Sequence, residues 1–264
     1  MEKTVAFYGG DSQTGTTMLA VSTAVLMARQ GKRVLMIAAS DHSGDLWIPT
    51  SEGNFLDDLL TDLQEHSLTW EKIRQYILTE AGVDFLPGIR ENHRDDFHEK
   101  DLSQICWLAE MHYDRILVDC GCGPATGLTA AAVRSGERAV VVITQQEKCL
   151  LRLQKKMQML DRLLPPQRLY AVNKYHDSRA FYTKKELAQK LECMPGDLIP
   201  IPYVPYGWQA EMEQRTLLRY RSFQNAVKRM AYRLEGGDEI GDSSAAGRKI
   251  RRILSALPHG GNDF

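Results

Sequence analysis

Short apolar runs alternate along the chain with longer stretches in which apolar residues recur every three or four positions. The short runs predict buried strands, at residues 4–8, 34–37, 82–88, 113–119, 139–143, 169–172 and 198–202. The longer stretches predict helices, one ending at residue 29 and the others at residues 55–66, 69–80, 101–112, 147–163, 184–191 and 208–234, with a break near Gln214. Strands that alternate with helices of this kind form βαβ units. We therefore expect an α/β fold with a single doubly wound, mostly parallel sheet.

The first forty residues follow the order strand, glycine-containing loop, helix, strand. Gly31 follows the helix where a C-cap is expected, and the run at 34–37 is short enough for a fully buried parallel strand. The loop fits the phosphate-binding pattern G-x-x-x-x-G-K-[ST], except that Thr16 stands where the pattern has lysine. The spacing predicts a phosphate-binding loop made of Gly10, Asp11, Ser12, Gln13, Thr14, Gly15, Thr16 and Thr17.

The exception at Thr16 changes the chemistry expected of this loop. In a P-loop, backbone N–H groups and a helix N-terminus face the phosphates, and the lysine adds a positive charge. Gly10 and Gly15 preserve the backbone part, and the Thr17 hydroxyl can bind Mg²⁺. Thr16 supplies no charge, and the Asp11 carboxylate repels a triphosphate unless it is paired or protonated. We therefore expect ATP and Mg²⁺ to bind weakly.

Residues 10–37 resemble the MinD/ParA family of deviant P-loop ATPases, whose loop reads G-K-G-G-x-G-K-T-T and whose next helix ends R-x-G-K-x-V-L-x-I-D. The positions that match in register are Gly15, Thr17, Gly31, Lys32, Val34, Leu35 and Ile37. The family's two lysines fall on Asp11 and Thr16, and the aspartates expected after the second strand fall on Ala38 and Ser40. Eroded loops of this kind are typical of the TadZ/CpaE-like pilus-assembly branch, which the chain resembles most.

A second candidate group follows the strand at 113–119. Asp119 ends this strand at the carboxyl edge of the sheet, where ligands of open α/β folds bind. Because an aspartate there holds the magnesium shell of P-loop proteins, we expect Thr17 and Asp119 to form a metal site. The alternative is that Asp119 only caps the next loop. In the family the following stretch, here 120–123, senses the γ-phosphate, and its two cysteines have no second pair with which to hold a metal.

The resemblance also implies two residues at the nucleotide base. Asn173 precedes Lys174 as in the family's V-x-N-R/K segment, where the asparagine contacts the adenine. Pro202 belongs to a stretch that resembles the family's I-P-x-D-P, with Val204 in place of the aspartate, and it would flank the base. The alternative is that the asparagine is an ordinary turn residue and that the prolines only stiffen a turn.

Composition limits the remaining possibilities. The chain has 264 residues, 43% of them hydrophobic, which suits one domain, and we place its end at residue 235. A formal net charge of −1 gives no basic field for nucleic acid. Five cysteines form no disulfide framework and suit a reducing cytosol. With no run of 18 apolar residues and no signal peptide, we expect a cytoplasmic protein.

The last residues form a separate unit in the sequence. Residues 236–247 have the glycine- and serine-rich composition of a flexible linker. In the tail at 248–264, four apolar residues share one helical face and four cations flank it: Ile250, Ile253, Leu254 and Leu257, with Arg248, Lys249, Arg251 and Arg252. Residues 248–257 resemble the membrane-targeting helix of MinD, which implies peripheral contact at the inner face of the cell membrane. The alternatives are a frayed or self-docked terminus and a docking peptide for a partner.

Two functional hypotheses follow. The first is a degenerate MinD/ParA-type nucleotide-binding protein that dimerises through its loop face. It would act as a positioning or regulatory factor, for pilus or secretion-system assembly, with weak or no ATP hydrolysis. The second is an active ATPase or an ATP-dependent ligase of the same fold, such as a dethiobiotin synthetase. Loss of one group that stabilises the transition state costs on the order of 10²–10³ in rate. Because both lysines are missing, the sequence favours the first hypothesis.

Overall fold

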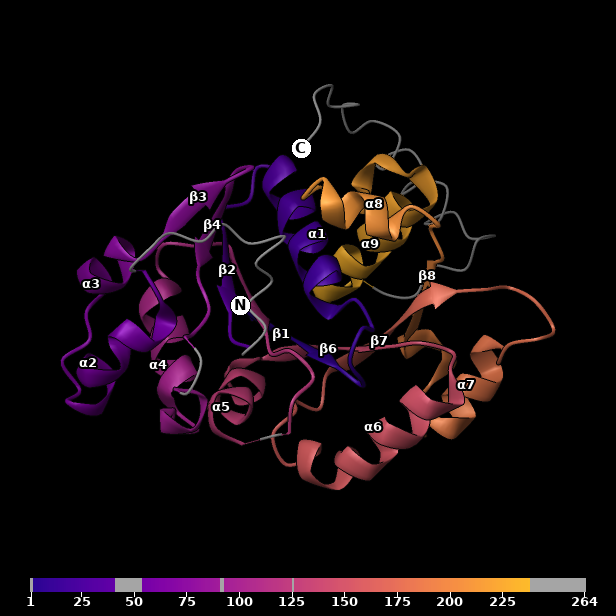
Figure 1. Ribbon diagram of the computed structural model, residues 1–264, viewed down its shortest axis with the longest axis horizontal. Coiled ribbons are helices and arrows are strands. Elements are labelled where there is room, and N and C mark those ends of the chain that lie inside the picture. Colours follow the sequence, from indigo (N-terminus) through magenta and orange to yellow (C-terminus); the bar gives the residue numbers. More distant parts are fainter. Residues whose placement is uncertain (1, 41–53, 91–92, 125, 238–264) are drawn as a thin grey trace.

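The computed structural model describes residues 2–40, 54–90, 93–124 and 126–237 (Figure 1). Its centre is an eight-stranded sheet in the order β3-β4-β2-β5-β1-β6-β7-β8. Neighbouring strands are parallel except for β3 and β4, which are antiparallel. The strands are β1 (Thr4–Gly9), β2 (Val34–Ala38), β3 (Leu78–Glu80), β4 (Val83–Leu86), β5 (Arg115–Asp119), β6 (Arg138–Ile143), β7 (Arg168–Tyr175) and β8 (Leu198–Pro202). The predicted α/β fold with one mostly parallel sheet is confirmed.

Helices cover both faces of this sheet (Figure 1). The α-helices are α1 (Thr16–Arg29), α2 (Leu60–Gln64), α3 (Trp70–Gln75), α4 (Asp101–Ala109), α5 (Gly127–Ser135), α6 (Glu147–Leu160), α7 (Lys184–Lys190), α8 (Gly207–Met212) and α9 (Arg221–Leu234). One core joins Val5 and Phe7 of β1 with residues of α1, α8 and α9, and the other joins Ala6 and Tyr8 with residues of α4, α5, α6 and α7. Successive side chains of a strand point to opposite faces, so β1 joins both cores and all of it is buried.

The predicted helix at 69–80 is wrong in its second half. Helix α3 ends at Gln75, and the chain then forms β3, which pairs with β4 as an antiparallel hairpin. Ala81 and Gly82 connect the two strands with positive φ angles of 50° and 78°. Two consecutive residues with positive φ are the turn that matches the twist of a hairpin. The turn therefore outweighs the helical spacing of the apolar residues before it.

Two further elements differ from the prediction. Helix α5 was not predicted, because seven of its nine residues are buried and it has no polar face to give a helical period. Strand β7 continues to Tyr175, so Asn173 lies within a strand rather than after one. The predicted break near Gln214 is confirmed, since this residue has a φ of 52° between α8 and α9.

Most of the predicted linker and the whole tail lie outside the described residues. The structure describes only Gly236 and Gly237 of the linker at 236–247, and none of the tail at 248–264. Both segments therefore stay predictions. No helix in the described part of the chain combines the length and the apolar character that crossing a bilayer requires.

Candidate functional site

The glycine loop connects β1 to α1 at the carboxyl edge of the sheet. Gly9 donates its N–H to the Gly121 carbonyl at 2.7 Å, and Gly10 donates to the Val142 carbonyl at 2.8 Å. These two bonds fix the start of the loop between the ends of β5 and β6. Gly15 has a φ of 84°, and a Cβ there would lie 2.4 Å from Asn173 Nδ2. Position 15 therefore requires glycine both for its backbone conformation and for lack of space.

Helix α1 opens toward this loop without a side-chain cap from the described residues. Its N-cap is Gly15, in the left-handed region, and the first bond of the helix runs from the Leu19 N–H to the Gly15 carbonyl. The N–H groups of the first turn have no partner within the helix and carry the positive end of its dipole. Such a helix start is able to receive a phosphate group.

Thr17 and Asp119 meet directly beside this helix start. Thr17 Oγ1 donates to Asp119 Oδ2 at 2.5 Å, and the Gly121 N–H donates to Asp119 Oδ1 at 3.1 Å. Burial raises the pKa of Asp119, while the two hydrogen bonds oppose that rise. A hydroxyl and a carboxylate at this distance are a fitting pair of ligands for Mg²⁺. The structure thus brings together the two residues that the sequence assigned to a metal site.

Thr16, in place of the lysine, turns into the protein. It is buried, and its Oγ1 lies 3.1 Å from Thr14 Oγ1. A Cβ on Gly9 would lie 2.6 Å from the same oxygen, so the side chain lies directly against β1. Thr14 Oγ1 also bonds to the Asp11 carbonyl at 3.1 Å. The two threonines therefore stabilise the loop through hydrogen bonds on its buried side. Position 16 carries no charge.

The carboxylate of Asp11 is paired. It accepts a hydrogen bond from Arg152 Nη1 at 2.6 Å and another from the Ser12 N–H at 2.8 Å. Partial burial by itself would raise the pKa of Asp11, but these bonds and the charges of Arg152 and Lys148 hold that pKa below its ordinary value. Arg152, which lies on α6 one helical turn after Lys148, was not among the site residues predicted from the sequence. The repulsion expected from Asp11 is therefore offset within the chain.

Asn173 supports the loop from β7. Its Nδ2 donates to the Thr14 carbonyl at 2.7 Å, and its Oδ1 accepts from the Lys174 N–H at 2.9 Å. Lys174 Nζ donates to the Gln13 carbonyl at 3.0 Å. Because the amide of Asn173 is buried and bonded to the loop, this residue positions the loop independently of any contact with a nucleotide base.

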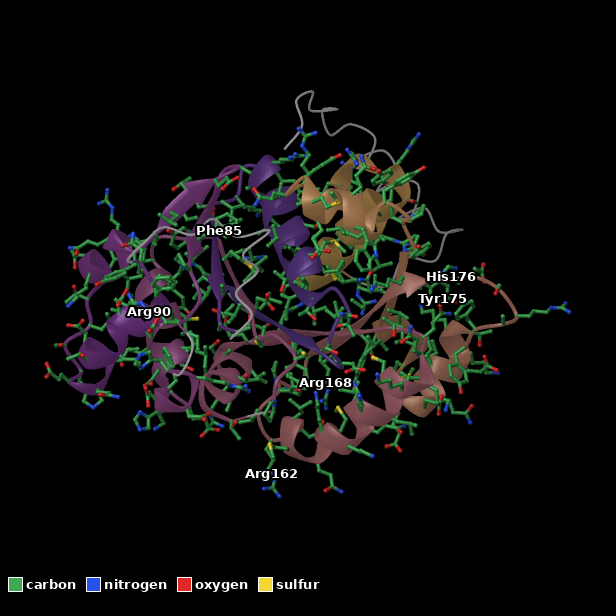
Figure 2. All side chains as sticks on the ribbon, in the orientation of Figure 1. Phe85, Arg90, Arg162, Arg168, Tyr175 and His176 are labelled. Atoms are coloured by element: carbon green, nitrogen blue, oxygen red, sulfur yellow. The ribbon has the colours of Figure 1, made fainter. Side chains whose placement is uncertain are left out.

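Pro202 ends β8, farther along the same edge of the sheet. An aromatic stack that the sequence analysis missed lies beside it, at the end of β7 where Figure 2 labels Tyr175 and His176. The His176 ring stacks on Tyr203 at a centroid distance of 4.9 Å and on Phe181 at 4.8 Å. Two of these residues, separated by 27 positions, meet only because β7 and β8 are neighbours, so no local pattern predicted the stack.

The segment after Asp119 is tied to β1 and to α6. Gly121 has a φ of 62°, and a Cβ there would lie 2.8 Å from Ser40 Cβ. Tyr8 Oη donates to the Gly123 carbonyl at 2.9 Å, and Lys156 Nζ donates to the Cys122 carbonyl at 2.8 Å. The backbone after Asp119 is therefore fixed by hydrogen bonds from Tyr8 of β1 and Lys156 of α6.

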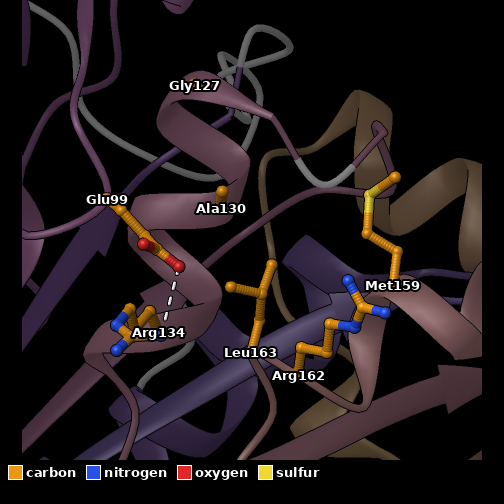
Figure 3. Close-up of a pocket in the computed structure, with 7 residues that line it drawn as sticks. All are labelled: Glu99, Gly127, Ala130, Arg134, Met159, Arg162 and Leu163. Atoms are coloured by element: carbon orange, nitrogen blue, oxygen red, sulfur yellow. Dashed lines mark hydrogen bonds and ion pairs between the residues drawn. The ribbon is translucent and has the colours of Figure 1, made fainter.

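A hollow of about 350 Å³ lies elsewhere, between α5 and the end of α6 (Figure 3). Its lining is Glu99, Gly127, Ala130, Arg134, Met159, Arg162 and Leu163. Glu99 and Arg134 form an ion pair of 3.1 Å across one wall. None of the loop residues lines this hollow, so it is separate from the site around Thr17 and Asp119.

Comparisons with known proteins identify the fold. No protein-family model matches the sequence, and no curated protein matches it. A ParA family ATPase from Chlorobium tepidum has 14% identity and a TM-score of 0.74, with coverage of 88% of this chain and 99% of its own. MinD from Pyrococcus horikoshii, solved with Mg-ADP, has 22% identity and a TM-score of 0.71, with coverage of 94% and 99%. The MinC:MinD complex from Aquifex aeolicus has 18% identity and a TM-score of 0.67, with coverage of 89% and 96%. The chain has the fold of the MinD/ParA P-loop NTPases.

Proposed function

We propose that this protein is a degenerate MinD/ParA-type nucleotide-binding protein that positions or regulates partner proteins and hydrolyses ATP slowly or not at all. The observation that carries the proposal is the contact of Thr17 with Asp119 beside the start of α1. These groups keep the backbone and metal-binding parts of a P-loop. Thr16 removes the charged part, and its hydroxyl lies against Thr14.

In this proposal the chain binds ATP together with Mg²⁺. The N–H groups at the start of α1 face the phosphates, and Thr17 and Asp119 hold the metal ion in place of their mutual hydrogen bond. Mg²⁺, when bound, neutralises phosphate charge. The MinD structure solved with Mg-ADP supports this ligand, since it shares the fold. Pro202, at the end of β8, would flank the base, as the family pattern implies.

Slow hydrolysis follows from the missing charges. Phosphoryl transfer depends on positioning and on stabilising charge in the transition state. The positions of both family lysines are occupied by Asp11, which is ion-paired, and by Thr16, which is buried. We propose that the protein uses nucleotide as a structural or regulatory ligand rather than as a substrate that turns over quickly.

We further propose a homodimer formed through the loop face and a protein partner in the cytoplasm. The complex of MinD with MinC shows that a protein with this fold assembles with a partner, which supports the second part. The eroded loop resembles the TadZ/CpaE-like branch, and we therefore place the partner in pilus or secretion-system assembly.

A titration of the whole chain with ATP and Mg²⁺ tests the proposed function. We expect isothermal calorimetry to detect weak, Mg²⁺-dependent binding, because the metal ligands are present and the lysines are absent. A phosphate-release assay on the same sample should give a rate at or near its background. Absence of any binding would contradict nucleotide binding. Rapid ATP turnover that Asp119→Ala abolishes would favour the alternative of an active ATPase or ligase.

The tail gives a second prediction, on membrane contact. A basic amphipathic helix gains roughly 1 kcal/mol per cation near an anionic surface, in addition to the insertion of its apolar residues. The full-length protein should therefore sediment with anionic vesicles, and a version that ends at Gly247 should not. Neutral vesicles are the control, because they keep the apolar phase and remove the surface charge. Equal sedimentation of the two versions would contradict the membrane role of residues 248–257.

A further inference from the structure

One face of α6 places three cations beside the loop. Lys148, Arg152 and Lys156 are spaced four residues apart, so they form a column along the helix. The helix lies close to the loop, since a Cβ on Gly10 would lie 3.5 Å from Leu153 Cβ. Arg152 is bonded to Asp11, and Lys156 to the backbone after Asp119.

The guanidinium group of Arg152 keeps most of its donors available. Asp11 accepts from Nη1, and within the described residues no other hydrogen bond of this guanidinium is present. A guanidinium has five N–H donors in a fixed plane. The Arg152 side chain is 46% exposed, whereas that of Asp11 is 14% exposed and is also held by the Ser12 N–H. Asp11 is therefore the fixed partner, and it determines the direction of the arginine.

Charges at the loop favour an anionic ligand even though Asp11 is acidic. Lys174 Nζ bonds to the Gln13 carbonyl on the side of the loop that faces β7. Cations from α6 lie on the other side, and the pKa of Asp11 is influenced by two of them. The loop thus lies between basic side chains from two separate elements. Within the loop, the two positions where the family has lysine are occupied by Asp11 and Thr16.

We propose that Arg152, aimed by Asp11, is the cation that contacts the terminal phosphate of a nucleoside di- or triphosphate at this loop. The inference rests on the proposed nucleotide binding and adds a residue to it. Arg152 supplies one positive charge where the family has two lysines, and its planar fork suits phosphate oxygens. Asp11 acts through Arg152, so it is a positioning residue whose ion pair persists while other donors of the guanidinium face the ligand.

The roles of these two residues can be separated by whether one substitution strengthens or weakens nucleotide binding. If Asp11 only repels phosphate, Asp11→Asn strengthens binding of ADP and ATP. If Asp11 aims Arg152, the same change weakens that binding, although it removes a negative charge. In a chain that already carries Arg152→Gln no arginine remains to be aimed, so Asp11→Asn should then strengthen binding. This reversal would not arise from a purely structural role of either residue.

Calorimetry with Mg²⁺-ATP, Mg²⁺-ADP and AMP on the full chain tests the proposal. We expect Arg152→Gln to weaken ATP and ADP binding about tenfold or more and to change AMP binding little, since a charge-assisted contact to the terminal phosphate is lost. Arg152→Lys should restore part of the affinity. Lys155→Gln is the matched control, because Lys155 is an exposed cation of the same helix outside the column.

Two results would overturn the inference while leaving the proposed function intact. One is wild-type affinity for ATP in Arg152→Gln, and the other is tighter binding by Asp11→Asn in the otherwise unchanged chain. Failure of the wild-type protein to bind any of the three nucleotides would instead contradict the proposed function, and the inference with it. Thermal unfolding of each variant verifies that it is folded, as expected for an exposed arginine.

Discussion

Asp119→Asn is expected to raise the melting temperature of the nucleotide-free protein and to abolish its response to Mg²⁺-ATP. Asp119 is completely buried, and burial raises the pKa of its carboxyl group. An acid whose pKa is higher in the folded state than in the unfolded state destabilises the fold as pH increases. An asparagine avoids this cost, and its amide can donate to Thr17 Oγ1 while its oxygen accepts the Gly121 N–H.

The expected gain is on the order of 1 kcal/mol, or about 2–4 °C for a chain of this size. It should be present at neutral pH and disappear below about pH 4, the ordinary range of an aspartate, where both states of the wild type are protonated. Scanning calorimetry at several pH values measures it. Mg²⁺-ATP should stabilise the wild type but not the variant, because an amide is a poor replacement for the charged metal ligand. A variant that is less stable than the wild type at pH 7, or that responds equally to Mg²⁺-ATP, would contradict the role assigned to Asp119.

Gly15→Ala is expected to destabilise the protein by roughly 2–4 kcal/mol and to remove nucleotide binding. The left-handed conformation costs an alanine about 1–2 kcal/mol. The remaining cost arises because the new Cβ would lie 2.4 Å from Asn173 Nδ2, which is buried and bonded to the Thr14 carbonyl. Either Asn173 or the loop has to move, and the start of α1 then loses its alignment. Chemical denaturation and a nucleotide titration measure the two effects.

Gly31→Ala is the matched control for this prediction. Gly31 has nearly the same φ, 82° against 84°, but a Cβ there would meet nothing within 4 Å. It should therefore show only the conformational part of the cost and leave nucleotide binding unchanged. Adding Asn173→Ala to Gly15→Ala removes the colliding amide, so the double variant should lose less stability than the sum of the two single variants. Equal losses at positions 15 and 31 would show that the contact with Asn173 does not matter.

Local signals in the sequence were sufficient for the loop and for the two residues proposed as metal ligands. The glycines at 10 and 15 have the spacing of a phosphate-binding loop, and Asp119 ends a run of strand residues, so each is recognisable within a few positions. Their convergence follows from topology, because β1 and β5 are parallel neighbours that end at the same edge. The predicted fold and the Thr17–Asp119 contact therefore needed only local pattern and the rules of parallel sheets.

The tertiary contacts that support the loop could not be predicted from local sequence patterns. Arg152 is 141 positions from Asp11, and Asn173 is 159 positions from Thr14, so no local pattern reveals either contact. Asn173 was expected to follow the end of its strand, as a base contact or as a turn residue, because the apolar run ends at Val172, whereas β7 continues to Tyr175. For the same reason Asp11 was expected to repel phosphate, since its partner Arg152 lies on a helix that is distant in the sequence. In both cases tertiary contacts, not residue type, decide what the side chain does.

The two edges of the sheet limit how copies of this chain can associate. At one edge β3 has only three residues, two of them exposed, and at the other edge β8 includes Pro200 and Pro202, which have no N–H to offer an incoming strand. Both edges are therefore poor templates for strand addition. A continuous sheet that runs through two molecules is disfavoured, which protects against open-ended aggregation. Self-association is left to helices and loops, whose side chains can distinguish a correct partner from an incorrect one.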